Sequence, residues 1–171
     1  DRVVVKVLVT GARGFLGSAA CSKLIGAGHD VVGVSRTAHD GMTTANLENS
    51  GSVISLLNTV RPDVIVNCAA RVDFGIDILP SLFPVNVLLP ALMGQWCRAN
   101  GGYLVQASTI VVHGAQVREP GSQTPDQPDT DYGRSKWLAE RNIDQSGCRA
   151  VSLRLGGLFG RSGPEHLGLN R

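Results

Sequence analysis

The amino-acid sequence predicts an α/β protein built on one doubly wound parallel sheet, with helices on both faces of the sheet. Two observations indicate this class. Short runs rich in β-branched residues alternate with longer segments of helical periodicity along the whole chain. Several of the short runs are apolar without interruption, as expected for parallel strands that are covered on both faces. Because crossovers between parallel strands are right-handed, this alternation winds helices onto both faces.

Six strands are expected, and each is a short apolar or β-branched run bounded by turn residues. The third is the weakest, because only the stretch MTTANL supports it. The fourth, PDVIVNCAA, has the uninterrupted apolar centre of a fully buried strand. The predicted strands are 3–10, 29–36, 42–47, 62–70, 101–109 and 149–155.

Four helices are expected between these strands, at 14–28, 50–60, 79–100 and 132–146. The first ends at Gly28, and the second stops before Pro62, because a helix interior seldom tolerates proline. Pro90 should kink the third helix. A polar loop rich in Pro, Gly, Gln and Asp occupies 114–131.

The composition excludes several classes of function. A chain of 171 residues is long enough for one domain with a substantial core and too short for two ordinary domains. Sixteen basic and fourteen acidic side chains give a net charge of +2, which offers no electrostatic basis for binding nucleic acid or an anionic membrane. The apolar runs are far shorter than a membrane span. We expect a single domain over 1–171.

The four cysteines are widely spaced along the chain. They form no CxxC pair, and no His cluster has the spacing of metal ligands, so we expect no metal site. Buried, reduced thiols in a cytoplasmic protein are the favoured interpretation. The cysteines are Cys21, Cys68, Cys97 and Cys148.

A glycine-rich stretch, TGARGFLG at 10–17, follows the first predicted strand and opens the first helix. Glycines at this spacing allow a tight turn, the close approach of a phosphate and close packing of the helix on the strand. The amides at the helix N-terminus then point at an anion. This context predicts a dinucleotide-binding loop. Its predicted cofactor-binding residues are Gly11, Arg13, Gly14, Phe15, Leu16 and Gly17.

The end of the second strand bears on the choice of cofactor. Sheets that bind NAD usually carry an acidic residue there, which accepts a hydrogen bond from the ribose 2′-hydroxyl. An arginine near this position can instead bind the 2′-phosphate of NADP. This chain has Ser35 and Arg36, and its next acidic residue is Asp40. A serine hydroxyl and a bidentate guanidinium both suit a phosphate. NADP(H) is therefore favoured over NAD(H).

Tyr132 and Lys136 lie four residues apart at the start of the last predicted helix, so their side chains share one helix face. The spacing alone also fits an aromatic ring packed on an aliphatic stem. An acid/base pair is the alternative, and other parts of the chain favour it.

Five stretches occur in the order typical of one family: TGARGFLG, NCAA at 67–70, AST at 107–109, YGRSK at 132–136 and LRLGGLFG at 153–160. Together they resemble the extended short-chain dehydrogenases, the NAD-dependent epimerase/dehydratase family, over essentially the whole chain. VRPDVIVNCAA at 60–70 is most similar to reductases of nucleotide-linked 4-keto sugars such as dTDP-4-dehydrorhamnose reductase. The resemblance implies a Rossmann-type fold, a nicotinamide cofactor and a nucleotide-sugar substrate.

The resemblance also implies three catalytic residues. Tyr132 corresponds to the family's acid/base, and Thr109 to a hydroxyl that hydrogen-bonds the substrate oxygen. Lys136 corresponds to the lysine that holds the nicotinamide ribose and lowers the pKa of the tyrosine. A free phenol has a pKa near 10, so proton transfer at neutral pH requires that shift. The tyrosine would then protonate a carbonyl oxygen while the cofactor's hydride attacks the carbon, or the reverse.

Further cofactor contacts follow from the same resemblance. Asn46 and Leu47 correspond to residues that meet the adenine, where an Asp is more usual than an Asn. Small residues of the NCAA stretch would let the cofactor pass over the fourth strand. His113 replaces a common tyrosine and is interpreted as a packing residue. The additional cofactor-site residues are Asn46, Leu47, Cys68, Ala69, Ala70, Asn86, Lys136 and Gly156, with Asn86 in either a substrate-side or a structural role.

Three functions remain open. The first is an NADP(H)-dependent reductase or dehydrogenase acting on a nucleotide sugar. The second is an epimerase or dehydratase that keeps NAD bound, although Ile110 and Val111 stand where dehydratases carry acidic residues. The third is a non-catalytic cofactor-binding or regulatory subunit, against which the retained Thr109, Tyr132 and Lys136 argue.

The resemblance carries two expectations about the larger assembly. The family has a smaller C-terminal substrate domain, of which this chain would hold at most the beginning, after residue 156. Family members often pair through two long helices, here 79–100 and 132–146, so a homodimer is expected.

Overall fold

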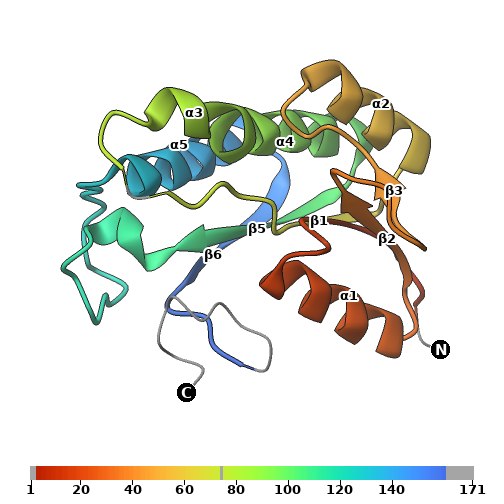
Figure 1. Cartoon of the computed structure of the whole chain (residues 1–171), viewed down its shortest axis with the longest axis horizontal. Helices are drawn as coiled ribbons and strands as arrows, with labels where there is room; N and C mark the ends of the chain where they lie inside the picture. The colour runs from red at the N-terminus through yellow and green to blue at the C-terminus, as the bar shows by residue number, and fades with distance from the viewer. Residues whose placement is uncertain (1–2, 74, 161–171) are drawn as a thin grey trace.

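The computed structural model describes residues 3–73 and 75–160, and these residues form one six-stranded sheet in which every strand pairing is parallel (Figure 1). The strands lie in the order β3-β2-β1-β4-β5-β6. The predicted α/β fold with a doubly wound parallel sheet is confirmed. The strands are β1 (Lys6–Thr10), β2 (Asp30–Ser35), β3 (Thr43–Thr44), β4 (Val64–Asn67), β5 (Tyr103–Thr109) and β6 (Arg149–Leu155).

The strand order reverses direction at the middle of the sheet. β1 pairs with β2 on one side and with β4 on the other, so the carboxyl end of β1 is flanked by both. At that end Thr10 lies opposite Val34 in β2 and Asn67 in β4. In open parallel sheets, ligands bind in the crevice outside the carboxyl ends of the strands at such a switch point.

The helices cover the two faces unequally (Figure 1). α1 (Phe15–Gly26) lies on one face, whereas α2 (Ser50–Val60), α4 (Leu89–Asn100) and α5 (Asp131–Ser146) lie on the other. The reversal after β3 explains this division, since right-handed crossovers that run in opposite directions place their helices on opposite faces. Within the described residues, α1 is therefore the one helix on its side of the sheet.

The hydrophobic core lies between the sheet and the larger group of helices. Leu8, Ile65 and Leu104 stand in register on adjacent strands, and all three are fully buried. Met93 from α4 and Ile143 from α5 belong to the same cluster. Burying each of these side chains contributes about 1.5–3 kcal/mol relative to leaving it exposed. This packing holds α5, which carries Tyr132 and Lys136, against the sheet.

The segment 79–100 differs from the prediction of one helix kinked at Pro90. It comprises α3 (Leu79–Phe83), a π-helical turn η1 (Pro84–Leu88) and α4. The Leu89 amide donates to the carbonyl of Pro84, five residues back. Pro90 explains the irregularity, because it has no N–H to donate to the carbonyl of residue 86 in a regular helix. The break in the helix precedes the proline and contains Asn86.

Most strands and the first helix are a few residues shorter than predicted, and two other elements differ in ways that have a structural reason. The third strand shrinks to Thr43–Thr44, which pairs with the end of β2. The last helix begins at Asp131, because the side-chain oxygen of Thr130 accepts a hydrogen bond from the Gly133 amide and caps it.

Residues 3–73 and 75–160 contain no helix long and apolar enough to cross a membrane. Over the same residues, no cluster of three or more His, Cys, Asp or Glu side chains could hold a metal ion.

Candidate functional site

The glycine loop joins the end of β1 to α1 and touches the chain beyond β4. Gly11 has a φ of 64°, a left-handed conformation that favours glycine. A Cβ on Gly11 would lie 2.9 Å from the Ala69 nitrogen and 2.9 Å from the Cys68 carbonyl carbon. A Cβ on Gly17 would lie 2.1 Å from the Gly11 carbonyl oxygen. Only glycine permits either approach.

The N-terminus of α1 suits an anionic ligand. Its capping residue, Gly14, has no side chain with which to cap the helix amides, and the first turn contains no acidic residue. The amides there, together with the helix dipole, favour a negatively charged group. A Cβ on Gly14 would meet only the Gly11 carbonyl oxygen, at 3.1 Å, so the backbone stays open to a ligand. The loop therefore fits the pyrophosphate of a dinucleotide.

A cleft of about 790 Å³ lies over this loop, at the switch point of the sheet. It is lined by residues from the ends of β1, β2 and β4 and from the segment after β3, so it brings together most of the predicted cofactor contacts. Those contacts are Gly11, Arg13, Gly14, Ser35, Arg36, Asn46, Leu47, Cys68, Ala69 and Ala70. The lining also contains residues that the sequence analysis did not single out, namely Val34, Thr37, Glu48, Arg71 and Val85.

The predicted phosphate-side residues are arranged around Thr37. Arg13 Nη1 donates to Thr37 Oγ1 at 2.9 Å, which holds its guanidinium at the turn after β2. The Ser35 hydroxyl donates to the Thr37 carbonyl at 2.8 Å and accepts from the Thr37 amide at 3.3 Å. Ser35 thus closes the turn after β2, and its hydroxyl is already engaged. Arg36 is exposed and lines the cleft.

The adenine-side residue Asn46 also stabilises its own turn. Its Oδ1 accepts from the Glu48 amide at 3.0 Å. A carbonyl oxygen has two lone pairs, so the predicted contact with an adenine amino group remains compatible with this bond. Leu47 is half-buried and packs against the hydrophobic core.

A ladder of buried polar side chains supports the floor of the cleft. Thr10 Oγ1 donates to Asn67 Oδ1 at 2.5 Å, and Asn67 Nδ2 donates to Gln106 Oε1 at 2.8 Å. The Ala69 amide donates to Thr10 Oγ1 at 3.2 Å. The ladder therefore fixes the backbone at the end of β4, beneath the cleft. Asn67 and Gln106 interrupt apolar strand sequences, a signal that could have identified them.

Asn86 is a buried link between three segments. Its Oδ1 accepts from the Arg71 amide at 2.8 Å, and its Nδ2 donates to the Arg71 carbonyl at 2.9 Å and to Ser135 Oγ at 3.0 Å. The π-helical turn presents this side chain to both the cleft-lining segment after β4 and the catalytic helix. Asn86 does not line the cleft itself, and its contacts support the structural one of its two predicted roles.

The predicted catalytic residues lie where β5 ends and α5 begins. Thr109 is the last residue of β5, and its Oγ1 accepts from the Val111 amide at 3.2 Å at the start of a 3-10 turn, η2 (Ile110–His113). A Cβ on Gly133 would lie 2.9 Å from the Val111 carbonyl oxygen, so this glycine lets α5 approach η2. The close approach brings Thr109 to the helix that carries Tyr132 and Lys136. Gly133 was missed in the sequence, where it is simply part of YGRSK.

Burial shifts the pKa values of Tyr132 and Lys136, the two titratable residues predicted to be catalytic, in opposite directions. Lys136 is 2% exposed, and burial lowers its pKa to about 8, although Glu140 and Cys68 act to raise it. Burial raises the pKa of Tyr132. In the chain alone, the tyrosine pKa is therefore not lowered as catalysis requires, and its lowering by lysine and cofactor stays a prediction. Burial also raises the pKa of the Cys68 thiol to about 11, so this thiol is neutral.

The remaining predicted residues lie outside the cleft lining. Phe15, Leu16 and Gly17 form the first turn of α1, and Gly156 is exposed just after β6. A Cβ on Gly156 would be 3.9 Å from the side chain of Ile110, so Gly156 is close to the end of β5.

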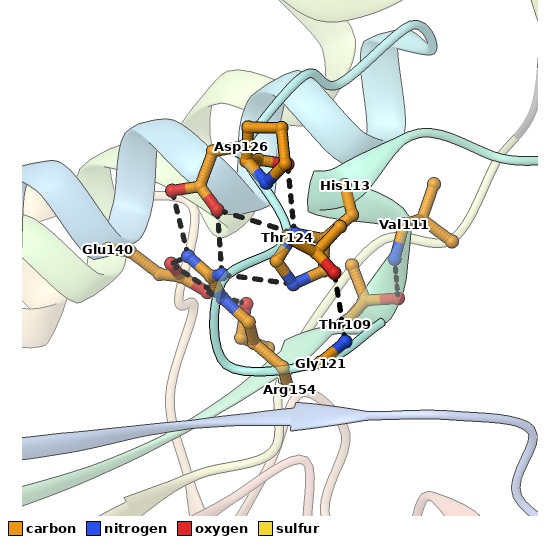
Figure 2. Close-up of polar contacts among 10 residues, drawn as sticks. Thr109, Val111, His113, Gly121, Thr124, Asp126, Glu140 and Arg154 are labelled. Atoms are coloured by element: carbon orange, nitrogen blue, oxygen red, sulfur yellow. Dashed lines mark hydrogen bonds and ion pairs between the residues drawn. The ribbon is translucent and has the colours of Figure 1, made fainter. Parts of the chain in front are cut away.

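His113 is buried, as a packing residue should be, and its ring nitrogens belong to a polar cluster (Figure 2). Its Nδ1 lies 3.0 Å from the Pro125 carbonyl oxygen and its Nε2 lies 3.1 Å from Arg154 Nη1. Arg154, on β6, also binds Asp126 and Glu140 through 2.7 Å and 2.6 Å ion pairs. No local motif marks this cluster, because its members come from η2, the loop 114–130, α5 and β6.

A parallel sheet of this strand order, with a glycine loop at its switch point, is the Rossmann-type architecture of dinucleotide-binding domains. The chain belongs to the NAD dependent epimerase/dehydratase family, whose model matches residues 7–169.

Two curated relatives illustrate the range of this family. The chain is 33% identical over 162 residues to the dTDP-4-dehydrorhamnose reductase of Streptomyces griseus, covering 92% of this chain and 51% of the reductase. It is 31% identical over 158 residues to the methionine adenosyltransferase 2 subunit beta of Danio rerio, covering 91% of this chain and 48% of that subunit. The chain thus spans about half the length of these relatives.

Solved structures show the same fold. The Thermus thermophilus UDP-glucose 4-epimerase in complex with NAD matches with a TM-score of 0.80 and 27% identity, over 94% of this chain and 58% of the epimerase. The Bacillus anthracis dTDP-4-dehydrorhamnose reductase in complex with NADP also matches with a TM-score of 0.80, at 22% identity, over 96% of this chain and 57% of the reductase.

Proposed function

We propose that this chain is the cofactor-binding and catalytic part of an NADP(H)-dependent oxidoreductase that acts on a carbonyl or alcohol of a nucleotide-linked sugar. The observation that carries the proposal is the position of Lys136. It is buried on the helix that carries Tyr132, and the adjacent Ser135 is tied through Asn86 to Arg71, which lines the cofactor cleft. The similarity to a dTDP-4-dehydrorhamnose reductase supports the substrate class.

The catalytic residues have separate tasks in this proposal. The cofactor, when bound, supplies or removes a hydride at the substrate carbon. Thr109 Oγ1 hydrogen-bonds the substrate oxygen and orients it. Tyr132 donates a proton to that oxygen during reduction, or removes one during oxidation. Lys136 as an ammonium ion holds the nicotinamide ribose and favours the anionic form of the phenol, because an opposite charge nearby stabilises the charged state.

The preference for NADP(H) rests on the arginines beside the turn after β2. Arg36 lines the cleft at the place where a ribose 2′-phosphate is expected, and Arg13 is held beside it through Thr37. The cleft side of this turn has no Asp or Glu at positions 35–37 to accept from a 2′-hydroxyl. The neighbouring folds bind either NAD or NADP, so a nicotinamide dinucleotide is supported in both cases.

Calorimetric titration of the chain with NADPH and, separately, NADH tests this proposal. We expect tighter binding of NADPH, and an Arg36→Ala variant should lose roughly tenfold or more of that preference, since a charge-assisted hydrogen bond contributes about 1.5–3 kcal/mol. Arg98→Ala, which removes an exposed arginine of α4, is the matched control and should leave the preference unchanged. Equal or tighter binding of NADH would remove the cofactor assignment.

Two other candidates are each supported by one similarity. The match to a UDP-glucose 4-epimerase in complex with NAD supports an epimerase that retains its cofactor, in which case NAD(H) would copurify with the chain. The match to a methionine adenosyltransferase 2 subunit beta supports a regulatory subunit. A regulatory subunit would bind cofactor without any requirement for Tyr132.

We also keep two expectations about the whole protein as proposals. A homodimer would pair α4 and α5 of two copies, and Leu92, Trp137 and Leu138 on these helices remain half-exposed, as such an interface requires. Four cysteines without a CxxC pair accord with reduced thiols and a cytoplasmic location.

A further inference from the structure

Glu140 lies one helical turn after Lys136 on α5, so the two side chains share a helix face. Its side chain is only 4% exposed. Arg154 holds both of its oxygens, with Nε 3.2 Å from each and Nη2 2.6 Å from Oε2, and the Ser108 hydroxyl donates to Oε1 (Figure 2). Contacts from Ser108 on β5 and Arg154 on β6 therefore fix the position of the Glu140 carboxylate on α5.

The cluster around Glu140 has more carboxylates than cations. The same guanidinium binds Asp126 through Nη1–Oδ1 at 2.7 Å and Nη2–Oδ2 at 3.0 Å. His113 Nε2 lies 3.1 Å from this guanidinium, which can only donate, and its Nδ1 lies 3.0 Å from the Pro125 carbonyl oxygen and 3.6 Å from Asp126 Oδ1. Two carboxylates share one guanidinium, so one net negative charge remains.

The other groups around Lys136 carry no charge at neutral pH. The Cys68 thiol, from the segment after β4, and the Tyr132 phenol, one turn earlier on α5, both have raised pKa values. The side chains of Thr109 from β5 and Asn86 from η1 are uncharged amides or hydroxyls, and α3 (LPSLF) contains no charged residue. Among the other elements packed against α5, α4 has one charged residue, Arg98 in its last turn, and β6 carries Arg149 in addition to Arg154.

We propose that Glu140 is a positioning residue for the catalytic pair: held by Arg154 and Ser108, its carboxylate keeps the buried Lys136 in the ammonium form. The inference rests on the proposed function in taking Lys136 as the partner of Tyr132 and of the cofactor. Without Glu140, burial would favour the neutral amine at the working pH. The neutral amine neither favours the anionic phenol nor offers a cation to the ribose. Asp126 contributes from the far side of the guanidinium, because it offsets the positive charge of Arg154.

Lysine-labelled protein allows a direct test by NMR titration of the side-chain ε-signals. The chain has three lysines, Lys6, Lys23 and Lys136, so the buried one can be assigned from a Lys136→Met spectrum. In Glu140→Gln, which keeps the shape and removes the charge, the titration midpoint of Lys136 should fall by roughly one to three pH units. Asp144→Asn is the matched control. It removes an exposed carboxylate that lies on the same helix two turns after Lys136, and it should leave the Lys136 midpoint unchanged.

Asp126→Asn is a second, milder variant, because Asp126 is 24% exposed and its loss leaves the Glu140–Arg154 pair intact. It should move the Lys136 midpoint in the same direction by a smaller amount. This variant also serves if Glu140→Gln does not fold. An unchanged midpoint in every folded variant, within about 0.3 units, would overturn the inference, since these shifts should be of order one unit.

Cofactor titrations across pH separate this inference from the proposed function. If both hold, NADPH affinity should fall above a pH that tracks the Lys136 midpoint, and that fall should begin at lower pH in Glu140→Gln. A shifted midpoint with pH-independent NADPH affinity would support the role of Glu140 and contradict the assignment of Lys136 to the cofactor. An unshifted midpoint with pH-dependent NADPH affinity would support the assignment of Lys136 to the cofactor and contradict the role of Glu140.

Discussion

The two halves of the site are built by different means. The cofactor half, at the ends of β1 and β2, is made from backbone and glycines, and it is open to a cleft of about 790 Å³. The catalytic half, around α5, is made from buried side chains that carry charge or hydrogen bonds, among them Lys136 and Glu140. The first would recognise a ligand by shape and backbone dipoles, with Arg13 and Arg36 as the charged side chains of its lining. The second depends on electrostatics around two side chains, Lys136 and Glu140, that are almost completely buried.

This difference means that the two halves should fail in different ways. A backbone-built site is damaged when an added atom collides with the chain, and its charge state is unaffected. A site built from buried charges is damaged when one partner is lost, even though the shape is unchanged. The following substitutions separate these two kinds of failure.

The largest expected effect is catalytic. In the whole protein, Tyr132→Phe should lower the rate of reduction of a nucleotide-linked 4-keto sugar by roughly 10²–10⁴-fold, because the proton donor is lost. NADPH affinity should change little, since the cofactor half is untouched. The control is Tyr103→Phe, which removes the hydroxyl of the chain's other tyrosine at the start of β5. Full activity in Tyr132→Phe would contradict the assignment of Tyr132 as the proton donor.

Loss of the guanidinium should destabilise the catalytic half most strongly. Arg154→Met leaves Glu140 and Asp126 without their shared cation, and removing one partner of a buried pair costs about 3–5 kcal/mol. We expect the lower end of this range, because Arg154 is 28% exposed. Urea unfolding measures the loss. Arg149→Met on the same strand should cost at most about 1 kcal/mol, since Arg149 is exposed and makes one hydrogen bond, to the Gly101 carbonyl.

A collision should break the cofactor half. Gly17→Ala would place a Cβ 2.1 Å from the Gly11 carbonyl oxygen, and neither backbone can move without opening the loop. We expect a loss of about 3 kcal/mol in unfolding free energy, at the upper end of overpacking effects, together with loss of NADPH binding. Gly14→Ala should cost less stability, because its Cβ meets one atom at 3.1 Å. Similar unfolding free energies for the two variants would contradict the predicted collision.

The smallest effect is a gain in stability with a defined pH dependence. Lys136 has a pKa of about 8 in the folded chain against an ordinary value of 10.5, so between these values the unfolded state binds more protons. Stability should therefore rise with pH from about 8 to 10.5, where the folded lysine is neutral and the unfolded one is charged. Below pH 8 both are charged, and the burial cost is fully present.

Lys136→Met should accordingly stabilise the chain at pH 7 by roughly 2 kcal/mol and abolish the rise above pH 8. Thermal unfolding at pH 7 and pH 9.5 measures both effects. Lys23→Met, on α1, serves as the control, and its unfolding should follow the wild-type pH profile. A Lys136→Met variant that is less stable at pH 7 would show that the lysine is not buried at a cost.

Much of the cofactor half could be predicted from local sequence. The glycine loop lies within eight consecutive residues between a strand and a helix, and the structure places its glycines in the close approaches that their spacing predicts. The π-helical turn could not be located from the sequence. Its position depends on how a helical segment that contains both Pro84 and Pro90 rearranges its backbone hydrogen bonds. Ser35 was assigned to phosphate from its position, whereas its hydroxyl closes a turn with Thr37. A sequence motif does not show that the backbone of Thr37 and a phosphate compete for the Ser35 hydroxyl.

The sequence by itself determined the parallel α/β fold and the position of the glycine loop, because strand periodicity, helix periodicity and glycine spacing are local properties. Only the tertiary structure decided what surrounds Lys136. Ser108, Asp126, Glu140 and Arg154 come from β5, a loop, α5 and β6, and folding alone brings them together. Burial and Coulomb interactions depend on distances in space, so the protonation of the catalytic lysine follows from the packed structure.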